Sequence, residues 1–131
     1  MAGLVRILER FTDDSKIDHI VLKVTTNFIG VSNEYDFKNE FLKYLDKPQS
    51  KSSTYCVDVS TLDHASEEFY NTLVSFDRRH KSLFDDKQLT VIGLSSNLKH
   101  RFNNDFHLDR IIATAPDLDS YKQPLCSRVS T

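Results

Sequence analysis

Residues 89–94 (LTVIGL) form an almost wholly apolar run. A strand of this composition is typical of a parallel sheet, in which helices cover both faces and little of the strand meets water. Parallel strands need long crossover connections, and these are usually helices. The run therefore predicts an α/β domain with this strand at the centre of the sheet.

Four other segments have the β-branched, apolar character of strands. They are residues 4–9 (LVRILE), 19–25 (HIVLKVT), 55–59 (YCVDV) and the short pair 111–112 (II). Polar residues predict a turn at 12–15, an irregular segment at 27–33, an exposed connection at 47–54, a loop at 60–66 and a turn at 85–87.

Apolar residues at helical spacing predict four helices between or after these strands. Two of the boundaries have specific signals: Pro48 follows the end of the first helix, and Pro116 suits the first turn of the last. The inward-facing residues, in chain order, are Phe37, Phe41, Tyr44 and Leu45; Phe69, Leu73, Phe76 and Leu83 or Phe84; Leu98 and Phe102 behind caps at Ser95 and Ser96; and Leu118 and Tyr121.

The order β-β-α-β-α-β-α-β-α predicts a mixed sheet of four to five strands backed by about four helices, because strands separated by a helix lie parallel through right-handed crossovers. The 131 residues, 39% of them hydrophobic and 27% charged, suit a single domain over residues 1–131. A net charge of −2 gives no electrostatic case for nucleic acid.

Cys56 and Cys126 stand far apart and match neither a metal-ligand pair nor a disulfide framework. No apolar run reaches the roughly 20 residues of a transmembrane helix. The sequence thus predicts a cytoplasmic protein with reduced thiols, no membrane insertion, and neither a metal nor a cofactor.

Two stretches, 55–62 (YCVDVSTL) and 89–112, resemble the core of the sulfate transporter and anti-sigma factor antagonist (STAS) family. Asp58 and Ser60 match the end of one family strand, and Gly93, Leu94 and Ser95 match the next strand and its turn. Residues 106–112 match the element that follows, with His107 in place of the usual glycine. The resemblance extends over a core of about 17–122, and the tail 123–131 is expected to be loose.

This resemblance implies a non-catalytic regulatory module that docks on a protein partner, such as an anti-sigma factor, a kinase-like protein or a related switch component. The setting it implies is transcription control, a stressosome-like assembly or transporter regulation. The docking surface would be the loop 60–66 and the start of the second helix. Its expected contact residues are Asp58, Ser60, Thr61, Asp63, His64, Ser66, Glu67 and Glu68.

The family carries a phosphorylatable Ser or Thr at that helix start, within an Asp-Ser-Ser-Gly-like motif, and the present sequence departs from it. Ser66 falls near the motif's Asp, Glu67 and Glu68 fall near its serines, and the motif's glycine is absent. Ser66 remains the candidate phosphosite, because a helix N-terminus tolerates an added phosphate that would repel a docked partner. The two glutamates either imitate a modified state or are simply favourable first-turn residues.

Other interpretations remain open at this stage. Asp63, His64 and Ser66 include the residue types of a nucleophile and its base, but no Gly-x-Ser-x-Gly elbow accompanies them. A small-molecule-binding or enzymatic domain would use the carboxyl ends of the strands. A homodimer would pair exposed sheet edges, and Phe28 and Tyr35, if exposed, would mark a contact surface.

Overall fold

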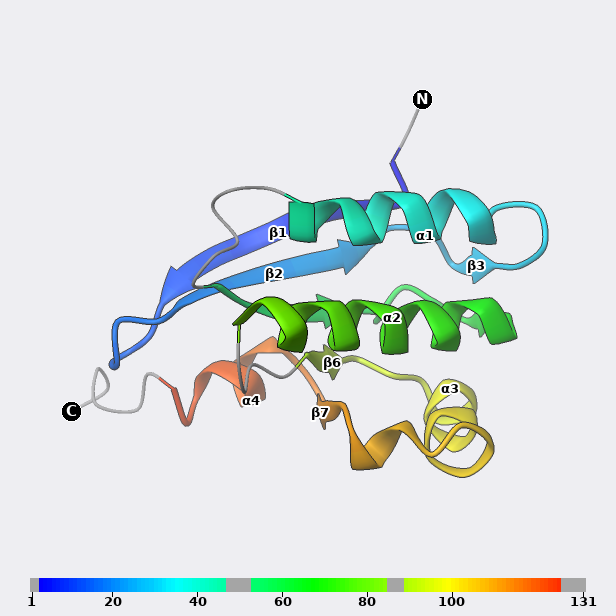
Figure 1. Ribbon diagram of the computed structural model, residues 1–131. Coiled ribbons are helices and arrows are strands. Elements are labelled where there is room, and N and C mark those ends of the chain that lie inside the picture. The colour runs from blue at the N-terminus through cyan, green and yellow to red at the C-terminus, as the bar shows by residue number, and fades with distance from the viewer. Residues whose placement is uncertain (1–2, 47–52, 85–88, 126–131) are drawn as a thin grey trace.

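The computed structural model describes residues 3–46, 53–84 and 89–125, which form one five-stranded sheet with helices packed against it (Figure 1). The strand order is β1-β2-β4-β6-β7. β1 is antiparallel to β2, and the other neighbours are parallel. The elements of the sheet and its connections are β1 (Val5–Thr12), β2 (Asp18–Val24), α1 (Glu34–Lys43), the 3-10 turn η1 (Tyr44–Asp46), β4 (Ser53–Asp58), α2 (Glu67–Phe84), β6 (Thr90–Ile92), α3 (Ser96–His100), the π turn η3 (Arg101–Asp105), the 3-10 turn η4 (Leu108–Arg110), β7 (Ala113–Ala115) and α4 (Leu118–Lys122).

This architecture confirms the predicted α/β class, the mixed sheet and the four helices. The position of the apolar strand β6 was predicted wrongly, however, because β4 lies at the centre of the sheet. The β1–β2 hairpin adds two strands on one side of β4, whereas only β7 lies beyond β6. Val91 and Ile92 of β6 are both buried. The apolar run therefore correctly indicated that both faces of the strand are covered, but it did not indicate the position of the strand in the sheet order.

The hairpin turn between β1 and β2 is built around Asp13. One carboxylate oxygen of Asp13 accepts the backbone N–H groups of Ser15 at 2.8 Å and Ile17 at 3.0 Å. Lys16 has a left-handed backbone with φ of 68°. The turn therefore begins one residue later than predicted, since Thr12 still pairs with Asp18 in the ladder.

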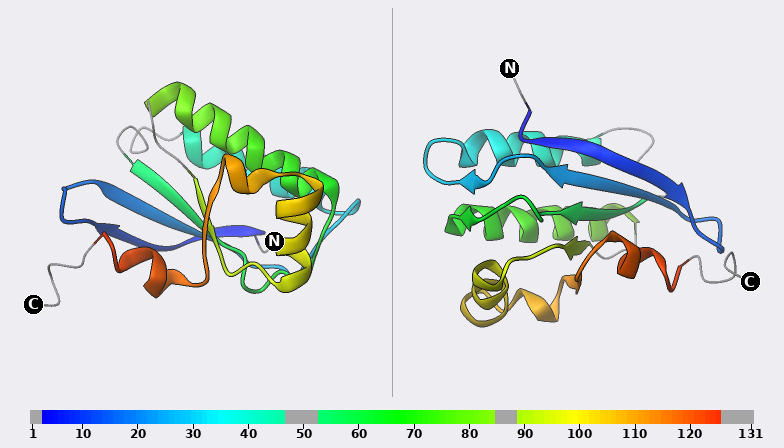
Figure 2. Two further views of the ribbon diagram at one scale, coloured as in Figure 1. Left: turned by 90° about the horizontal axis from the view of Figure 1, so that it is seen from below. Right: turned by 180° about the vertical axis from the view of Figure 1, so that it is seen from behind.

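Helices α1 and α2 lie side by side over one face of the sheet (Figure 2). Successive residues of β4 alternate between the faces, so Tyr55 and Val57 point into this larger core while Cys56 points the other way. Aromatic rings fill the layer between helices and sheet, with Phe41 and Phe76 stacked at 4.3 Å between ring centroids. The inward positions predicted for the first half of α2 are confirmed, as are those of the first helix except Tyr44, which is half-buried and lies with Leu45 in η1.

Helix α4 covers part of the opposite face and closes a smaller core (Figure 2). Its Tyr121 hydroxyl lies 2.7 Å from His19 Nδ1, and His19 Nε2 lies 2.7 Å from Asp13 Oδ2. An ionised Asp13 can only accept, so the imidazole donates to it from Nε2, and Nδ1 bonds to the Tyr121 hydroxyl. Phe11 stacks on His19 with 4.7 Å between ring centroids, so this polar chain is enclosed by apolar side chains.

The C-terminal third differs from the prediction in its boundaries. Strand β7 spans Ala113–Ala115 rather than residues 111–112, because Ile111 and Ile112 close the turn η4. Pro116 precedes the N-cap Asp117, whose side chain accepts the Ser120 N–H, so it does not occupy the first turn of α4. Ser95 caps α3 as predicted.

His107 adopts a left-handed backbone with φ of 53°, at the position where the resembling family has glycine. Glycine favours this conformation because it has no Cβ. The left-handed conformation of residue 107, shortly after the π turn η3, shows why a glycine would suit this position.

Several predictions fall on other parts of the chain. Ser53 and Thr54, which were expected in an exposed connection, belong to β4. The rest of that connection (47–52), the turn at 85–87, the side chains of Leu83 and Phe84, Cys126 and the end of the tail lie outside the described residues.

Candidate functional site

The loop after β4 begins at Asp58, whose carboxylate organises the residues that follow. One oxygen accepts the backbone N–H of Ser60 at 2.8 Å. The other lies 3.7 Å from Lys23 Nζ, which also donates to Ser60 Oγ at 3.5 Å. Asp58 and Ser60 are therefore held by a cation from the neighbouring strand β2.

Gly93, at the end of β6, allows this loop to pass close to the sheet. A Cβ at Gly93 would lie 2.8 Å from Ser60 Cβ and 2.9 Å from Ser60 N, and the glycine has φ of +79°. Both the space and the backbone conformation require glycine here. Gly93, which the resemblance picked out, thus sets the position of Ser60.

The loop predicted over residues 60–66 is partly a strand. β5 (His64–Ala65) pairs in parallel with β3 (Phe28–Ile29), and β3 lies in the segment predicted to be irregular. The Ser66 N–H donates to the Ile29 carbonyl at 2.8 Å and extends the contact. The prediction failed because a two-residue strand has no periodicity that a sequence pattern could reveal.

Ser66 precedes α2 and connects it to α1. Its hydroxyl donates to Glu34 Oε2 at 2.9 Å, so the starts of the two helices lie side by side. Glu67 and Glu68 follow in the first turn of α2, where the positive end of the helix dipole stabilises carboxylates. Lys38 of α1 lies 3.6 Å from Glu68 and partly neutralises it.

Arg101, the first residue of η3, supports the same loop. Its Nη1 donates to the Ala65 carbonyl at 3.0 Å, while its guanidinium carbon lies 5.3 Å and 5.5 Å from the ring centroids of Tyr70 and Phe106. Asp105 adds an ion pair at 3.5 Å. Arg101 is not among the contact residues expected from the sequence, so its structural role was missed.

We call residues 60–66 together with Glu67 and Glu68 the corner. Its Leu62 and Ala65 are buried, Ser66 and Glu68 are half-buried, and its remaining side chains are exposed. The exposed side chains are Ser60, Thr61, Asp63, His64 and Glu67. The backbone of the corner, which Asp58, Gly93 and Arg101 hold in place, therefore carries polar side chains that face solvent.

The exposed large apolar side chains of the described residues lie beside this corner. Phe28 and Tyr35 are 43% and 72% exposed, so they meet the condition set in the sequence analysis, and their role as contact residues stays a prediction. Val31, which the sequence analysis did not consider, is 90% exposed. The Phe28 ring stacks on His64 with 5.1 Å between ring centroids and so joins these residues to the corner.

Asp63, His64 and Ser66 do not form a hydrogen-bonded trio. The His64 ring lies against Phe28, and the Ser66 hydroxyl is directed to Glu34. Within residues 3–46, 53–84 and 89–125, no group of three or more His, Cys, Asp or Glu side chains could hold a metal ion. No helix in the same ranges has the length and apolar character needed to cross a bilayer.

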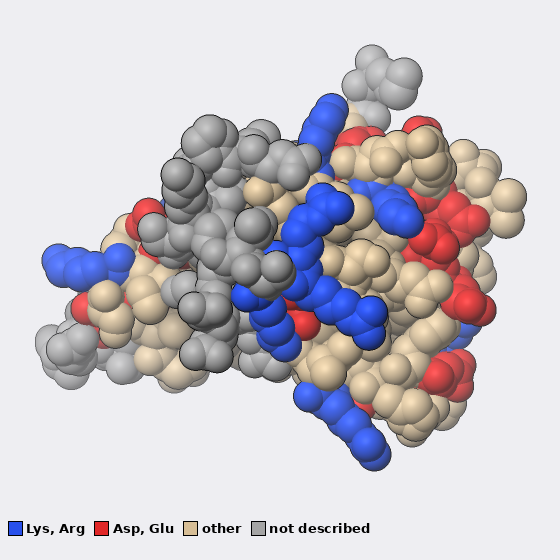
Figure 3. All heavy atoms as spheres, in the orientation of Figure 1, with Lys and Arg blue, Asp and Glu red and all other residues tan. Residues whose placement is uncertain are grey.

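Charge is segregated around the corner. Residues 26–36 and 58–68 together contain six Asp or Glu and no Lys or Arg, although the whole chain has 17 basic and 19 acidic residues. Figure 3 shows acidic side chains gathered over the starts of α1 and α2, with basic side chains over the middle of the same face. The corner is therefore the acidic end of this face.

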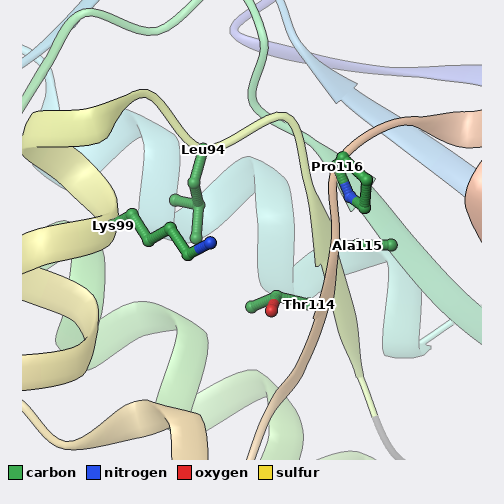
Figure 4. A pocket seen from close by; sticks show the side chains of 5 residues that line it. All are labelled: Leu94, Lys99, Thr114, Ala115 and Pro116. Carbon is green, nitrogen blue, oxygen red and sulfur yellow. The ribbon is translucent and has the colours of Figure 1, made fainter.

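A separate pocket of about 390 Å³ lies at the carboxyl ends of β6 and β7. Figure 4 shows the Lys99 side chain extending into it from α3, opposite Thr114 of β7. Leu94, Ala115 and Pro116 complete its lining. This is the place where open α/β sheets bind ligands.

No family model and no curated protein matches this sequence. Solved structures do match, and three of them illustrate the likeness. A protein from Thermotoga maritima assigned as an anti-sigma factor antagonist aligns with a TM-score of 0.65 and 14% identity over 89% of this chain and 92% of its own. An anti-sigma-factor antagonist (STAS) domain protein from Planctomyces limnophilus gives 0.64 and 12% over 86% and 91%.

The third structure is a serine-to-glutamate variant of RsbS from Moorella thermoacetica. It aligns with a TM-score of 0.64 and 19% identity over 96% of this chain and 99% of its own. All three alignments span nearly the full length of both chains, so the likeness concerns the whole arrangement of sheet and helices. The chain described here thus has the fold of the anti-sigma factor antagonist (STAS) domain, as the sequence resemblance predicted.

Proposed function

We propose that this chain is a non-catalytic regulatory module that docks on a partner protein through the corner. The carrying observation is that the corner is anchored from three elements while its polar side chains face solvent. Asp58, Gly93 and Arg101 fix its backbone, and Thr61, Asp63 and His64 are presented outward. A surface already held in one conformation loses little conformational entropy on binding, which favours affinity.

The names of the structural neighbours support an anti-sigma factor as the partner. A kinase-like protein or a related switch component is the alternative that the sequence resemblance implies. In this proposal the chain acts in the cytoplasm in the control of transcription, and partner switching is the mode of regulation. Asp58 and Ser60 would act mainly as supports, because they bond to each other and to Lys23.

Ser66 would be the switch residue if the module is regulated by phosphorylation. Its hydroxyl is bonded to Glu34, and Glu67 follows it directly. A phosphate of about −1.5 to −2 charge there would break the bond to Glu34 and repel both carboxylates. Intact-mass analysis of protein from its native cell tests this point, and a chain that stays unmodified across growth conditions would count against it.

Glu67 and Glu68 already place permanent negative charge at the start of α2. If they imitate a modified state, reversing their charge should alter partner choice. If they only stabilise the helix, Glu67→Lys should lower stability without altering the choice of partner.

The docking test compares Glu67→Lys with Asp119→Lys. Both residues are exposed and lie in the first turn of a helix, but Asp119 belongs to α4 on the opposite face of the sheet. The partner is isolated with the native chain from source cells, purified, and titrated by calorimetry. We expect Glu67→Lys to weaken binding by about tenfold or more and Asp119→Lys to leave it unchanged. Equal affinities for all three chains would reject the corner as the docking site.

A second candidate function uses the pocket lined by Leu94, Lys99 and Thr114. Its position at the strand carboxyl ends and its single ammonium suit a small anionic metabolite. A thermal-shift screen of such metabolites tests this, because a ligand raises stability in proportion to RT ln(1 + [L]/Kd). A shift that Lys99→Gln abolishes would favour ligand binding.

A homodimer is compatible with docking and would pair sheet edges. The edge strands of the described sheet are β1 and β7. Light scattering at several concentrations of the purified chain measures the oligomeric state directly.

A further inference from the structure

The segment from β3 to α1 exposes apolar side chains that the chain's own core does not use. Val31 is 90% exposed, Tyr35 72% and Phe28 43%. We call these three residues the apolar cluster. Phe28 belongs to β3, which pairs with β5 of the corner, so the two surfaces are continuous there.

This segment is an ordered one. The Asn33 side chain accepts the Gly30 N–H at 2.9 Å and donates to the Phe28 carbonyl at 2.8 Å. The Glu34 N–H also donates to the Gly30 carbonyl, at 2.8 Å, which joins the turn to the start of α1. The apolar cluster is therefore displayed by a hydrogen-bonded turn.

Gly30 also shapes the position of the Phe28 ring. A Cβ on Gly30 would lie 2.4 Å from the tip of that ring, so only glycine lets the ring fold back across the turn. The same ring stacks on His64. Phe28 is thus pre-ordered as a half-exposed platform between the turn and the corner.

Carboxylates border the apolar cluster. Asp36 is exposed in the first turn of α1, Asp63 is exposed directly before β5, and Glu67 is exposed at the start of α2. None of these three forms an ion pair within the described ranges, whereas Lys38 and Lys23 are engaged with Glu68 and Asp58. Unpaired charge around ordered apolar side chains is the pattern of a contact surface with an electrostatically complementary partner.

We infer that the docking surface includes the apolar cluster, and that the partner is a protein whose contact face has an apolar socket bordered by Lys and Arg side chains. This inference rests on the proposed function and defines its partner. Val31 and Tyr35 enter the socket, Phe28 packs at its edge, and Asp36, Asp63 and Glu67 face the partner's cations. A second copy of this chain fits less well, because its described surface exposes these same apolar residues beside acids rather than bases.

The test begins with a photo-crosslinking residue, p-benzoylphenylalanine, placed separately at His64, Val31 and Asp119 of the full chain in source cells. The protein that crosslinks at His64 serves as the probe. The inference requires the same protein to crosslink at Val31 and not at Asp119. A crosslink at His64 alone would retain the corner as a docking site and reject the apolar cluster.

The purified probe is then titrated with variants of the full chain. We expect Val31→Ser combined with Tyr35→Ser to weaken binding by about tenfold or more, while Ser32→Ala, in the same turn, leaves it unchanged. Thermal unfolding should be the same for all of these chains, because the altered side chains are exposed. Unchanged affinity for the double variant would overturn the inference, even if Glu67→Lys weakens binding.

The partner's charge is tested separately. We expect the affinity to fall as salt is raised, mainly through slower association, and Asp36→Lys to reduce that dependence. An affinity independent of salt would reject the basic border. If Glu67→Lys and the double variant both bind the probe as tightly as the native chain does, the inference and the proposed function are both rejected.

Discussion

The hydroxyl of Ser66, directly before α2, donates a hydrogen bond to the carboxylate of Glu34 in the first turn of α1, 2.9 Å away. The two residues are 32 positions apart in sequence. The geometry of the corner therefore depends on a helix that belongs to a different part of the chain.

A double-mutant cycle should measure this contact. Ser66→Ala, Glu34→Ala and the double variant should give a coupling free energy of about 1 kcal/mol in urea unfolding, because a half-buried bond to a carboxylate is being removed. A coupling below about 0.3 kcal/mol would show that the two side chains do not stabilise each other.

Gly93→Ala should destabilise the protein and displace Ser60. The left-handed backbone and the 2.8 Å approach to Ser60 Cβ both oppose a side chain there, and such substitutions cost about 1–3 kcal/mol. Gly3→Ala is the control, since a Cβ at Gly3 would approach the flexible Glu40 carboxylate at 3.1 Å. Equal melting temperatures for the two variants would contradict this account of Gly93.

Arg101→Ala should loosen the corner. The substitution removes the donor to the Ala65 carbonyl and the guanidinium that packs on Tyr70 and Phe106. We expect faster amide hydrogen exchange across residues 63–66 and a loss of about 1–2 kcal/mol in stability. Arg101→Lys should restore little, because an ammonium lacks the planar stacking surface. Exposed Arg110 provides the control, and equal exchange in Arg110→Ala and Arg101→Ala would refute the role.

Acid should destabilise the chain through Asp13. Burial raises the pKa of this carboxyl, but hydrogen bonds from His19, Ile17 and Ser15 outweigh burial and hold the pKa below its ordinary value of 3.8. A depressed folded pKa contributes stability that is present above the unfolded pKa and is lost as pH falls through the folded one.

Wild type should accordingly lose stability more steeply than Asp13→Asn between about pH 5 and pH 2. Urea unfolding across that range measures the slopes, with exposed Asp119→Asn as the control. Parallel slopes for wild type and Asp13→Asn would mean that Asp13 contributes nothing to acid sensitivity.

Cys56 should be unreactive in the folded protein. Burial, with a smaller contribution from Asp58, raises the pKa of its thiol far above the ordinary value of 9.0. In a Cys126→Ser background, a thiol reagent at pH 8 should label Cys56 only as fast as the protein unfolds, and denaturant should accelerate the labelling. Rapid labelling without denaturant would show that the thiol has access to solvent in the native state.

The sequence predicted those parts of the fold that depend on local pattern. Valine and isoleucine in β2 and β4 indicated strands, and the stripe of Phe69, Leu73 and Phe76 indicated the buried face of α2. The position of β6 in the strand order was predicted wrongly, because every interior strand of a covered sheet is buried on both faces.

The candidate site was predictable only in outline. The sequence placed the corner after a strand and before a helix, which is correct, and named its exposed side chains. Its supports Glu34 and Arg101 come from 32 and 36 residues away in the chain, and no local pattern relates them to the corner. Val31 lies in the turn after β3, and no periodicity in the sequence indicated its exposure.

Helix α4 closes the smaller core with residues from the far end of the chain. Tyr121 bonds to His19, Lys122 pairs with Glu9, and the Leu125 carbonyl accepts the Asp14 N–H. During synthesis His19 leaves the ribosome 102 residues before Tyr121, so the β1–β2 hairpin emerges well before these contacts can form. The face of the hairpin that carries Phe11 and Val21 therefore stays open to chaperones until α4 has been synthesised.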